Sequence, residues 1–296
     1  MLLFLTGSKD GTADLLLSKI GNRAFRFNYD IFSDYSVVVR PDTWSIENPT
    51  GLKITDLTAT SAFWWKAFNY FIDGEEYIAE EVKYTFREIY GSFSARSLIK
   101  GTSPDFHRFK GKLQILRVAS AYFEIPKTVC GWGNAIKTDK QPENGIVAKS
   151  LASGLTVTNK ALFTTEVAFS KLDPRYPWYL QEKIDADSDL TIFVCGKSLF
   201  AFERDRSGLK GLDWRNQDDV FDVQQQWKPF SLTKKQSDAV SAFLLEMKVD
   251  WGRLDFLRTG SKLVFLEYNA NGQFLFLDLK NEFGILDRVV EYLLES

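Results

Sequence analysis

Two carboxylates near the C-terminus are the residues of this chain best suited to do chemistry. The apolar runs at 252–258 and 262–269 predict two strands joined by a tight turn, and this pairing sets Asp255 opposite Glu267. Like charges that face each other across a strand pair repel, and more strongly among apolar neighbours. A bound divalent cation reverses the sign of that interaction. The pair therefore predicts a metal site.

Magnesium is the metal that the neighbouring residue types favour. Strand alternation puts Phe265, Glu267 and Asn269 on one face of the second strand, which adds an amide oxygen to the two carboxylates. Hard oxygen ligands of this kind suit Mg²⁺ rather than zinc. The alternative is an ordinary hairpin with a solvent-facing polar stripe, followed by an Asn271-Gly272 turn.

Composition narrows the chemistry further. The chain has 296 residues, of which 45% are hydrophobic, so it can bury a large core divided among two or three packed lobes. Its single histidine, His107, argues against a multi-histidine zinc site and against a histidine base. Carboxylates, lysines, arginines and bound ions must therefore carry out whatever reaction occurs.

Charge and cysteine content bear on partners and location. A net charge of −2 argues against nucleic acid or an anionic membrane as the main partner. No apolar run is long enough to span a bilayer, and Met1–Thr6 is too short for a signal peptide. The two cysteines, Cys130 and Cys195, do not suggest a disulfide framework. We therefore expect a cytoplasmic protein.

The elements that must position these residues predict a mixed α/β fold. Strands at 1–6 and 24–27 flank a helix at 13–20, a βαβ opening typical of a small parallel sheet. From Thr60 to Ile99 the pattern is helical and aromatic. Later elements are predicted as helices at 112–123, 233–248 and 285–294 and strands at 146–149, 162–167, 179–184, 190–195 and 198–202. The expected lobes span residues 1–110, 111–180 and 181–296.

The order of these features resembles that of ATP-grasp enzymes. An Asp strand followed by a Glu-x-Asn strand is similar to their magnesium-binding end, which implies that Asp255, Glu267 and Asn269 bridge the phosphates of ATP through Mg²⁺. The run GRLDFL implies that Arg253 faces the oxyanion that develops during acyl transfer. The implied fold has an N-terminal pre-ATP-grasp lobe and two further lobes that grip ATP between their sheets.

Motifs upstream of the metal strands resemble the nucleotide-binding parts of the same enzymes. Lys112 at a helix start and Lys149 in IVAKS look like the two lysines that hold phosphates as point charges. The small-residue loop 151–159 would close over the γ-phosphate. DWR ends in Arg215, which resembles the arginine that pairs with the transferred phosphoryl group. The run YLQEKI looks like the hinge that reads adenine, formed here by Gln181, Glu182, Lys183 and Ile184.

Among ATP-grasp enzymes the chain is most similar to the graspetide, or microviridin-type, peptide maturases. The resemblance implies that ATP activates an Asp or Glu side chain of a precursor peptide as an acyl phosphate. A Ser or Thr hydroxyl or a Lys amine of the same peptide then closes a macrocycle. A homodimer is also implied, and Gln273 beside the metal strand is a candidate substrate contact. The similar segments are LLFLTGSKDGTADLL (2–16), FRFNYDIF (25–32), FTTEV (163–167) and FLEYNANGQF (265–274).

Two departures from the family pattern leave alternatives open. The run Asp189-Leu190-Thr191 stands where those maturases usually carry Asp-Leu-Arg, and FWWKAFN (63–69) stands where they often carry paired arginines. One alternative is an ATP-grasp ligase that joins a free amino acid or another small amine to a carboxylate. Another is a peptide-binding relative that keeps the fold without catalysis.

Overall fold

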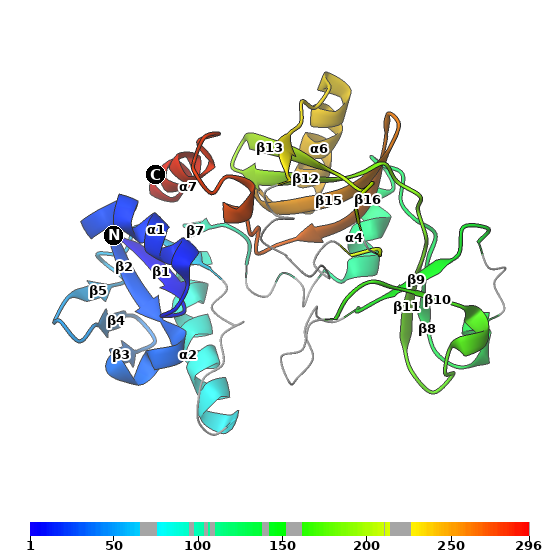
Figure 1. Ribbon diagram of the computed structural model, residues 1–296. Helices are drawn as coiled ribbons and strands as arrows, with labels where there is room; N and C mark the ends of the chain where they lie inside the picture. The colour runs from blue at the N-terminus through cyan, green and yellow to red at the C-terminus, as the bar shows by residue number, and fades with distance from the viewer. Residues whose placement is uncertain are drawn as a thin grey trace.

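Three lobes follow one another along the chain in the computed structural model (Figure 1). The blue and cyan first lobe and the green second lobe lie at opposite ends, and the yellow to red third lobe joins them. The structure describes residues 1–65, 76–94, 98–103, 106, 110–137, 142–151, 162–209, 211–213 and 226–295. No helix in these ranges is both long and apolar enough to cross a membrane.

The first lobe is built on a parallel sheet with a helix on each face. Alternate residues of β1 point to opposite faces, so Leu2 and Phe4 pack with α1, whereas Leu3 and Leu5 pack with α2. The sheet has the order β2-β1-β6-β7, and a smaller antiparallel sheet has the order β3-β4-β5. The elements of this lobe are β1 (Leu2–Thr6), α1 (Gly11–Ile20), β2 (Ala24–Asn28), β3 (Ser36–Val39), β4 (Trp44–Glu47), β5 (Lys53–Thr55), β6 (Ser61–Trp64), α2 (Glu76–Ser94) and β7 (Ile99–Lys100).

The predicted βαβ opening is confirmed, but the helical prediction from Thr60 onward is wrong at its start. Ser61–Trp64 is a strand that pairs in parallel with β1, and all four of its residues are buried. A strand buried on both faces is a continuous apolar run, which lacks the alternation that separates a strand from a helix. Within the described residues the helix α2 begins at Glu76.

The second lobe is an antiparallel sheet with the order β10-β9-β11-β8. The strand β11, which comes last in the sequence, extends to Glu182, so the sheet ends beyond the predicted lobe boundary at residue 180. The predicted strand at 162–167 is shorter than expected and begins at Thr165. The strands are β8 (Thr128–Gly131), β9 (Ile146–Lys149), β10 (Thr165–Val167) and β11 (Trp178–Glu182).

The third lobe is an antiparallel sheet with the order β14-β13-β12-β15-β16. The predicted helix cap at Thr233 is confirmed, because its side chain accepts from the Gln236 N–H while the Gln236 side chain accepts from the Thr233 N–H. The elements are β12 (Ser188–Cys195), β13 (Ser198–Asp205), β14 (Lys228–Pro229), α6 (Lys234–Met247), β15 (Trp251–Thr259), β16 (Lys262–Asn269) and α7 (Ile285–Leu294).

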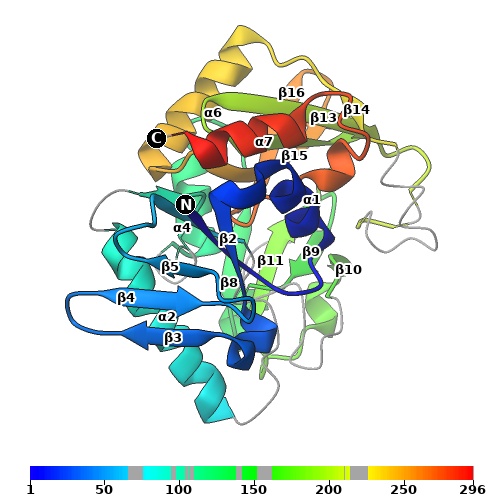
Figure 2. The same cartoon turned by 90° about the vertical axis from the view of Figure 1, so that its left-hand side faces the viewer.

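Two helices tie the lobes together. The helix α4 (Lys112–Ala119) precedes the second lobe in sequence, yet its Leu116 and Ala119 share a core with Phe243 of α6 and Phe265 of β16. The final helix α7 packs against α1 of the first lobe, and Figure 2 shows the two side by side. The first and third lobes therefore share one continuous core.

Candidate active site

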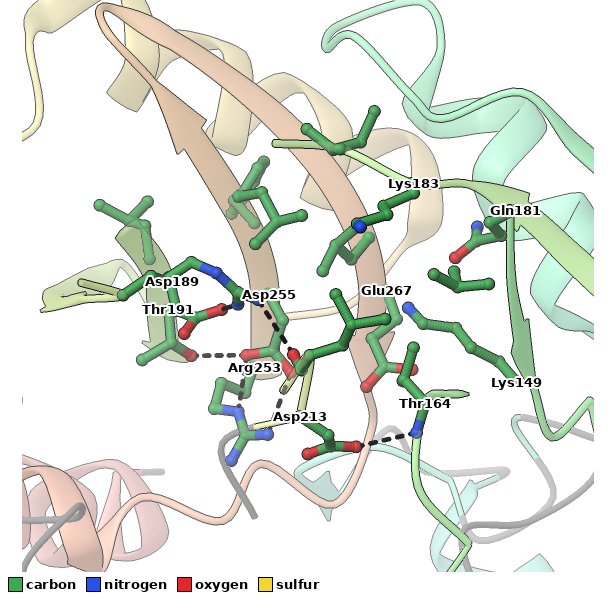
Figure 3. A pocket seen from close by; sticks show the side chains of 18 of the residues that line it. Lys149, Thr164, Gln181, Lys183, Asp189, Thr191, Asp213, Arg253, Asp255 and Glu267 are labelled. Carbon is green, nitrogen blue, oxygen red and sulfur yellow. Dashed lines mark hydrogen bonds and ion pairs between the residues drawn. The ribbon is translucent and has the colours of Figure 1, made fainter. Parts of the chain in front are cut away.

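A cleft lies between the sheets of the second and third lobes. Lys149 of β9 and Gln181 of β11 line one wall, and Thr191, Asp255 and Glu267 of the third-lobe sheet line the other (Figure 3). Its empty volume, which includes the open mouth, is about 940 Å³. The cleft is therefore open to solvent between the two sheets.

The two carboxylates predicted to face each other do so. Asp255 of β15 pairs directly with Glu267 of β16, which confirms the predicted register. Asn269 Nδ2 donates to Asp255 Oδ2 at 2.6 Å and to Glu267 Oε1 at 3.3 Å. The sheet thus brings all three predicted metal ligands together. Because the amide nitrogen faces both carboxylates, binding of a metal through the amide oxygen would require the Asn269 side chain to turn.

A β-bulge beside the carboxylates corrects the predicted strand faces. Asp255 pairs with Glu267 but Phe256 pairs with Phe265, so Leu266 is an extra residue in β16. Leu266 and Glu267 therefore both line the cleft, and Phe265 packs in the core on the opposite face of the sheet. The expectation that Phe265 shares a face with Glu267 is wrong, because the extra residue reverses the alternation.

The donor set fits magnesium. Two half-buried carboxylates provide hard oxygen atoms at one place in the cleft, and Asn269, which contacts both, could add an amide oxygen after its side chain turns. Mg²⁺ takes few protein ligands together with phosphate and water. No cluster of three or more His, Cys, Asp or Glu side chains suited to a metal occurs among the residues that the structure describes. A metal site at this place would therefore need Asn269 as its third protein ligand.

Two residues besides Asn269 hydrogen-bond to the Asp255 carboxylate. Thr191 of the neighbouring strand β12 donates its hydroxyl to Asp255 Oδ1 at 2.7 Å. Arg253 donates from Nε to Oδ1 and from Nη2 to Oδ2, both at 3.0 Å. Its guanidinium also lies 5.3 Å from the centre of the Phe276 ring. The carboxylate is thus fixed in direction before any ligand enters.

Lys149 enters the cleft from the opposite wall, toward Glu267 (Figure 3). Burial is the largest influence on the pKa of Lys149 and lowers it; Glu267 is the next and raises it, and Lys112 lowers it. Lys112 is not among the residues that line the cleft, and its Nζ donates to the Ser150 carbonyl at 2.6 Å. The two predicted lysines are therefore neighbours, and Lys149 is the one that lines the cleft.

The residues of the predicted hinge lie along one edge of the cleft. Gln181 is buried, and its Nε2 donates to Thr128 Oγ1 at 3.1 Å and to the Tyr179 hydroxyl at 3.2 Å. This leaves its amide oxygen as an acceptor. The Lys183 N–H donates to the Gly145 carbonyl at 3.0 Å, so it cannot also bind a base.

Backbone groups after Gln181 remain suited to a base edge. The Glu182 N–H donates to the Lys127 carbonyl at 2.8 Å, and Lys183 Nζ pairs with Glu166 at 2.9 Å. Within the described part of the chain, neither the Lys183 carbonyl nor the Ile184 N–H has a backbone partner outside the strand ladders. Those two groups are the hinge atoms that could pair with adenine.

The comparisons with known proteins give a match only at the level of structure. No protein-family model matches the chain, and no curated protein matches it either. A RiPP-associated ATP-grasp ligase from Chryseobacterium gregarium, in complex with ADP and a leader and core peptide, superposes with a TM-score of 0.82 and 22% identity over 99% of this chain and 96% of that chain. The macrocyclase MdnC of Microcystis aeruginosa, bound with the precursor peptide MdnA, gives 0.81 and 23% over 100% and 99%. The chain has the ATP-grasp fold.

Within this ATP-grasp fold, the predicted site residue Arg215 lies outside the described ranges, and Gln273, like Lys112, does not line the cleft. Arg215 and most of the loop 151–159 are outside the described residues. The preceding Asp213 does line the cleft, and its Oδ2 accepts from the Thr164 N–H at 3.1 Å. Gln273 is exposed, and it is its carbonyl that contacts the site, accepting from Arg253 Nη1 at 3.2 Å. A substrate contact by Gln273 stays a prediction.

The ATP-grasp cleft also contains residues that the sequence did not single out. Arg206 follows β13, Trp227 precedes β14, and Phe276 follows β16, and all three line the cleft. Asp189, noted only as part of a family departure, is buried in the same wall. Nothing in their spacing places them together, because they meet only through the pairing of β12 with β13 and the return of the chain after β16.

Proposed function

We propose that this protein is an ATP- and magnesium-dependent ligase that joins an Asp or Glu side chain of a precursor peptide to a hydroxyl or amine of the same peptide. The convergence of Asp255, Glu267 and Asn269 opposite Lys149 in a cleft between two sheets carries the proposal. It is supported by likeness over nearly the whole chain to a ligase solved with ADP and a leader and core peptide and to a macrocyclase bound with a precursor peptide.

The residues of the cleft suit distinct parts of a nucleotide. Gln181 and the backbone at Lys183 and Ile184 would hold the adenine. Lys149 would meet the inner phosphates as a point charge, and an approaching triphosphate would favour its charged form. Asp255, Glu267 and Asn269 would hold Mg²⁺, which when bound neutralises phosphate oxygens.

The reaction that suits this arrangement has two steps. A carboxylate of the peptide attacks the γ-phosphorus of ATP, so that ADP leaves and an acyl phosphate forms. A hydroxyl or amine of the peptide then attacks the acyl carbon, and phosphate leaves. Arg253, held by Asp255 at the cleft wall, would stabilise the oxyanion of the second step. Arg215 would orient the transferred phosphoryl group, as its motif suggests.

The proposed surroundings follow from the family resemblance and from charge. We propose a cytoplasmic homodimer that binds neither nucleic acid nor membrane, in keeping with the net charge of −2. Light scattering on the purified protein tests the dimer, because a monomer at micromolar concentration would contradict it.

An ADP-release assay with matched substrates tests the function. The candidates are short peptides rich in Thr, Ser or Lys and in Asp or Glu, offered beside free amino acids. Peptide-dependent ADP release with loss of one water per bond formed, seen by mass spectrometry, supports a macrocyclising ligase. Release with free amino acids alone would indicate the small-molecule ligase instead, and nucleotide binding without turnover would indicate the non-catalytic relative.

A further inference from the structure

Two arginines meet a single buried carboxylate at the wall of the cleft. Asp189 of β12 accepts from Arg204 at Oδ2 and from Arg206 Nη1 at Oδ1, the latter at 2.5 Å. The Arg204 side chain is fully buried and lies 5.6 Å from the Trp227 ring centre. The Arg206 side chain is 14% exposed and lines the cleft. Arg206 is therefore the arginine of this pair that a ligand can reach.

Arg206 is held by contacts that, among the described residues, use only part of its guanidinium. Beyond the bond to Asp189, its Nη2 donates to the Leu212 carbonyl at 3.0 Å, and its backbone N–H donates to the Asp187 carbonyl at 3.0 Å. A guanidinium has five N–H groups, of which these contacts with described residues use two. Asp189 holds it through one oxygen instead of the two-point pair that Arg and carboxylate often form. The rest of the fork suits a phosphate group.

The strand order places Arg206 across the metal residues from Lys149. Glu267 lies on the edge strand β16, Asp255 on β15, Asp189 on β12, and Arg206 just after β13, in that spatial order. Lys149 approaches from the Glu267 side, since Glu267 is the carboxylate with the greatest effect on it. Figure 3 likewise shows Lys149 and Asp189 on opposite sides of Asp255. A phosphate chain that starts at Lys149 and crosses the metal residues would end at Arg206.

Position 191, which is nearer to Asp255, cannot provide the same contact. Thr191 is uncharged, and its hydroxyl is donated to Asp255. Arg253 is charged, but two of its nitrogens are bound to Asp255 and the third to the Gln273 carbonyl. Of the two arginines that line the cleft within the described residues, Arg206 is thus the one that is bound to Asp189 instead of Asp255.

We infer that Arg206 binds the terminal phosphate of the nucleotide and that Asp189 positions it. This inference rests on the proposed function, because it requires ATP in the cleft. Arg206, which follows β13, would thus make the anion contact that the uncharged Thr191 of β12 cannot make.

Calorimetric titration with two nucleotides tests the inference without a peptide. With Mg²⁺ present, Arg206→Gln should weaken binding of the ATP analogue with a β,γ-imido bridge by about tenfold or more, and binding of ADP by less than about threefold. Arg206→Lys, which keeps the charge but not the fork, should lie between. Arg175→Gln is the matched control, because Arg175 is exposed and pairs with Asp173 away from the cleft.

Each outcome decides between the two claims. An Arg206→Gln protein that binds the analogue as tightly as the wild type overturns the inference alone, as does an equal loss for ADP and analogue. A wild-type protein that binds neither nucleotide overturns the proposed function and the inference with it. If the Arg206→Gln protein does not unfold cooperatively, the Arg206→Lys protein is tested in its place. An Arg206→Lys protein that keeps the wild-type preference for the analogue over ADP then overturns the inference.

Discussion

Arg253 and Asp255 form a two-point ion pair along one strand, with Nε to Oδ1 and Nη2 to Oδ2 both at 3.0 Å. Residues two apart on a strand share a face, so β15 alone brings this pair to the cleft. The arginine thereby fixes the orientation of the Asp255 carboxylate at the wall of the cleft. Under the proposed function, the same side chain would also stabilise the oxyanion of acyl transfer.

Arg253→Lys should separate turnover from binding. Lysine keeps the charge but cannot make the two-point contact with Asp255, so we expect ADP release to fall by about a hundredfold or more. The affinity for Mg²⁺ and ADP should fall much less, because the other ligands remain. Steady-state kinetics beside calorimetry measures both quantities. Arg175→Lys serves as the control, and a normal rate in Arg253→Lys would exclude the oxyanion role.

Lys149→Gln should chiefly weaken nucleotide binding. The side chain is a cation that enters the cleft from the second lobe, and under the proposed function its removal would take away a partner of the inner phosphates. We expect affinity for ADP to fall by about tenfold to a hundredfold. Lys262→Gln, on an exposed lysine of β16 paired with Glu124, should leave it unchanged. Equal affinity in the wild type and Lys149→Gln would remove Lys149 from the nucleotide site.

Gly252→Ala should destabilise the hairpin that bears the site. Gly252 has φ 141°, and a Cβ there would lie 2.5 Å from a ring carbon of Tyr268. Positive φ and the overlap together should cost about 2 kcal/mol or more in the free energy of unfolding. Gly208→Ala is the control, because no atom lies within 4 Å of its added Cβ. Urea unfolding that gives the same midpoint for both variants would contradict this account of the hairpin.

Stability should decline in alkali. Burial raises the pKa of Cys195 from 9.0 to about 12, and burial also raises the pKa values of Tyr179, Tyr268 and Tyr292. The unfolded chain releases these protons at lower pH than the folded chain, so stability present below pH 9 is lost as pH rises toward 12. Urea midpoints measured across this range should fall. They should fall less steeply in Cys195→Ala, and identical slopes would assign the loss to other groups.

The sequence allowed prediction of the hairpin but not of its irregularity. The turn pairs Thr259 with Lys262, and this register continued along the hairpin would set Asp255 opposite Leu266. The bulge at Leu266 shifts the register by one residue, so that Asp255 meets Glu267. The bulge adds one apolar residue among apolar neighbours, so no pattern indicates it, and simple alternation predicts the wrong face for Phe265.

Residues that meet only through distant pairing could not be predicted. The strand β6 is buried on both faces and therefore resembles a buried helix in its sequence. Arg206 reaches the cleft because β13 pairs with β12 and carries it to Asp189, a contact between residues whose spacing resembles many others. The proposed nucleotide residues Lys149 and Gln181 also line the cleft, and it was motif resemblance, not periodicity, that predicted them.

The magnesium dependence of nucleotide binding tests the metal site most directly. Titration of ADP into the wild-type protein should show affinity about tenfold or more higher with Mg²⁺ than with a chelator. In a folded Glu267→Gln protein, Mg²⁺ should make little difference. If Glu267→Gln keeps the full Mg²⁺ effect, Asp255, Glu267 and Asn269 do not hold the ion that carries the phosphates.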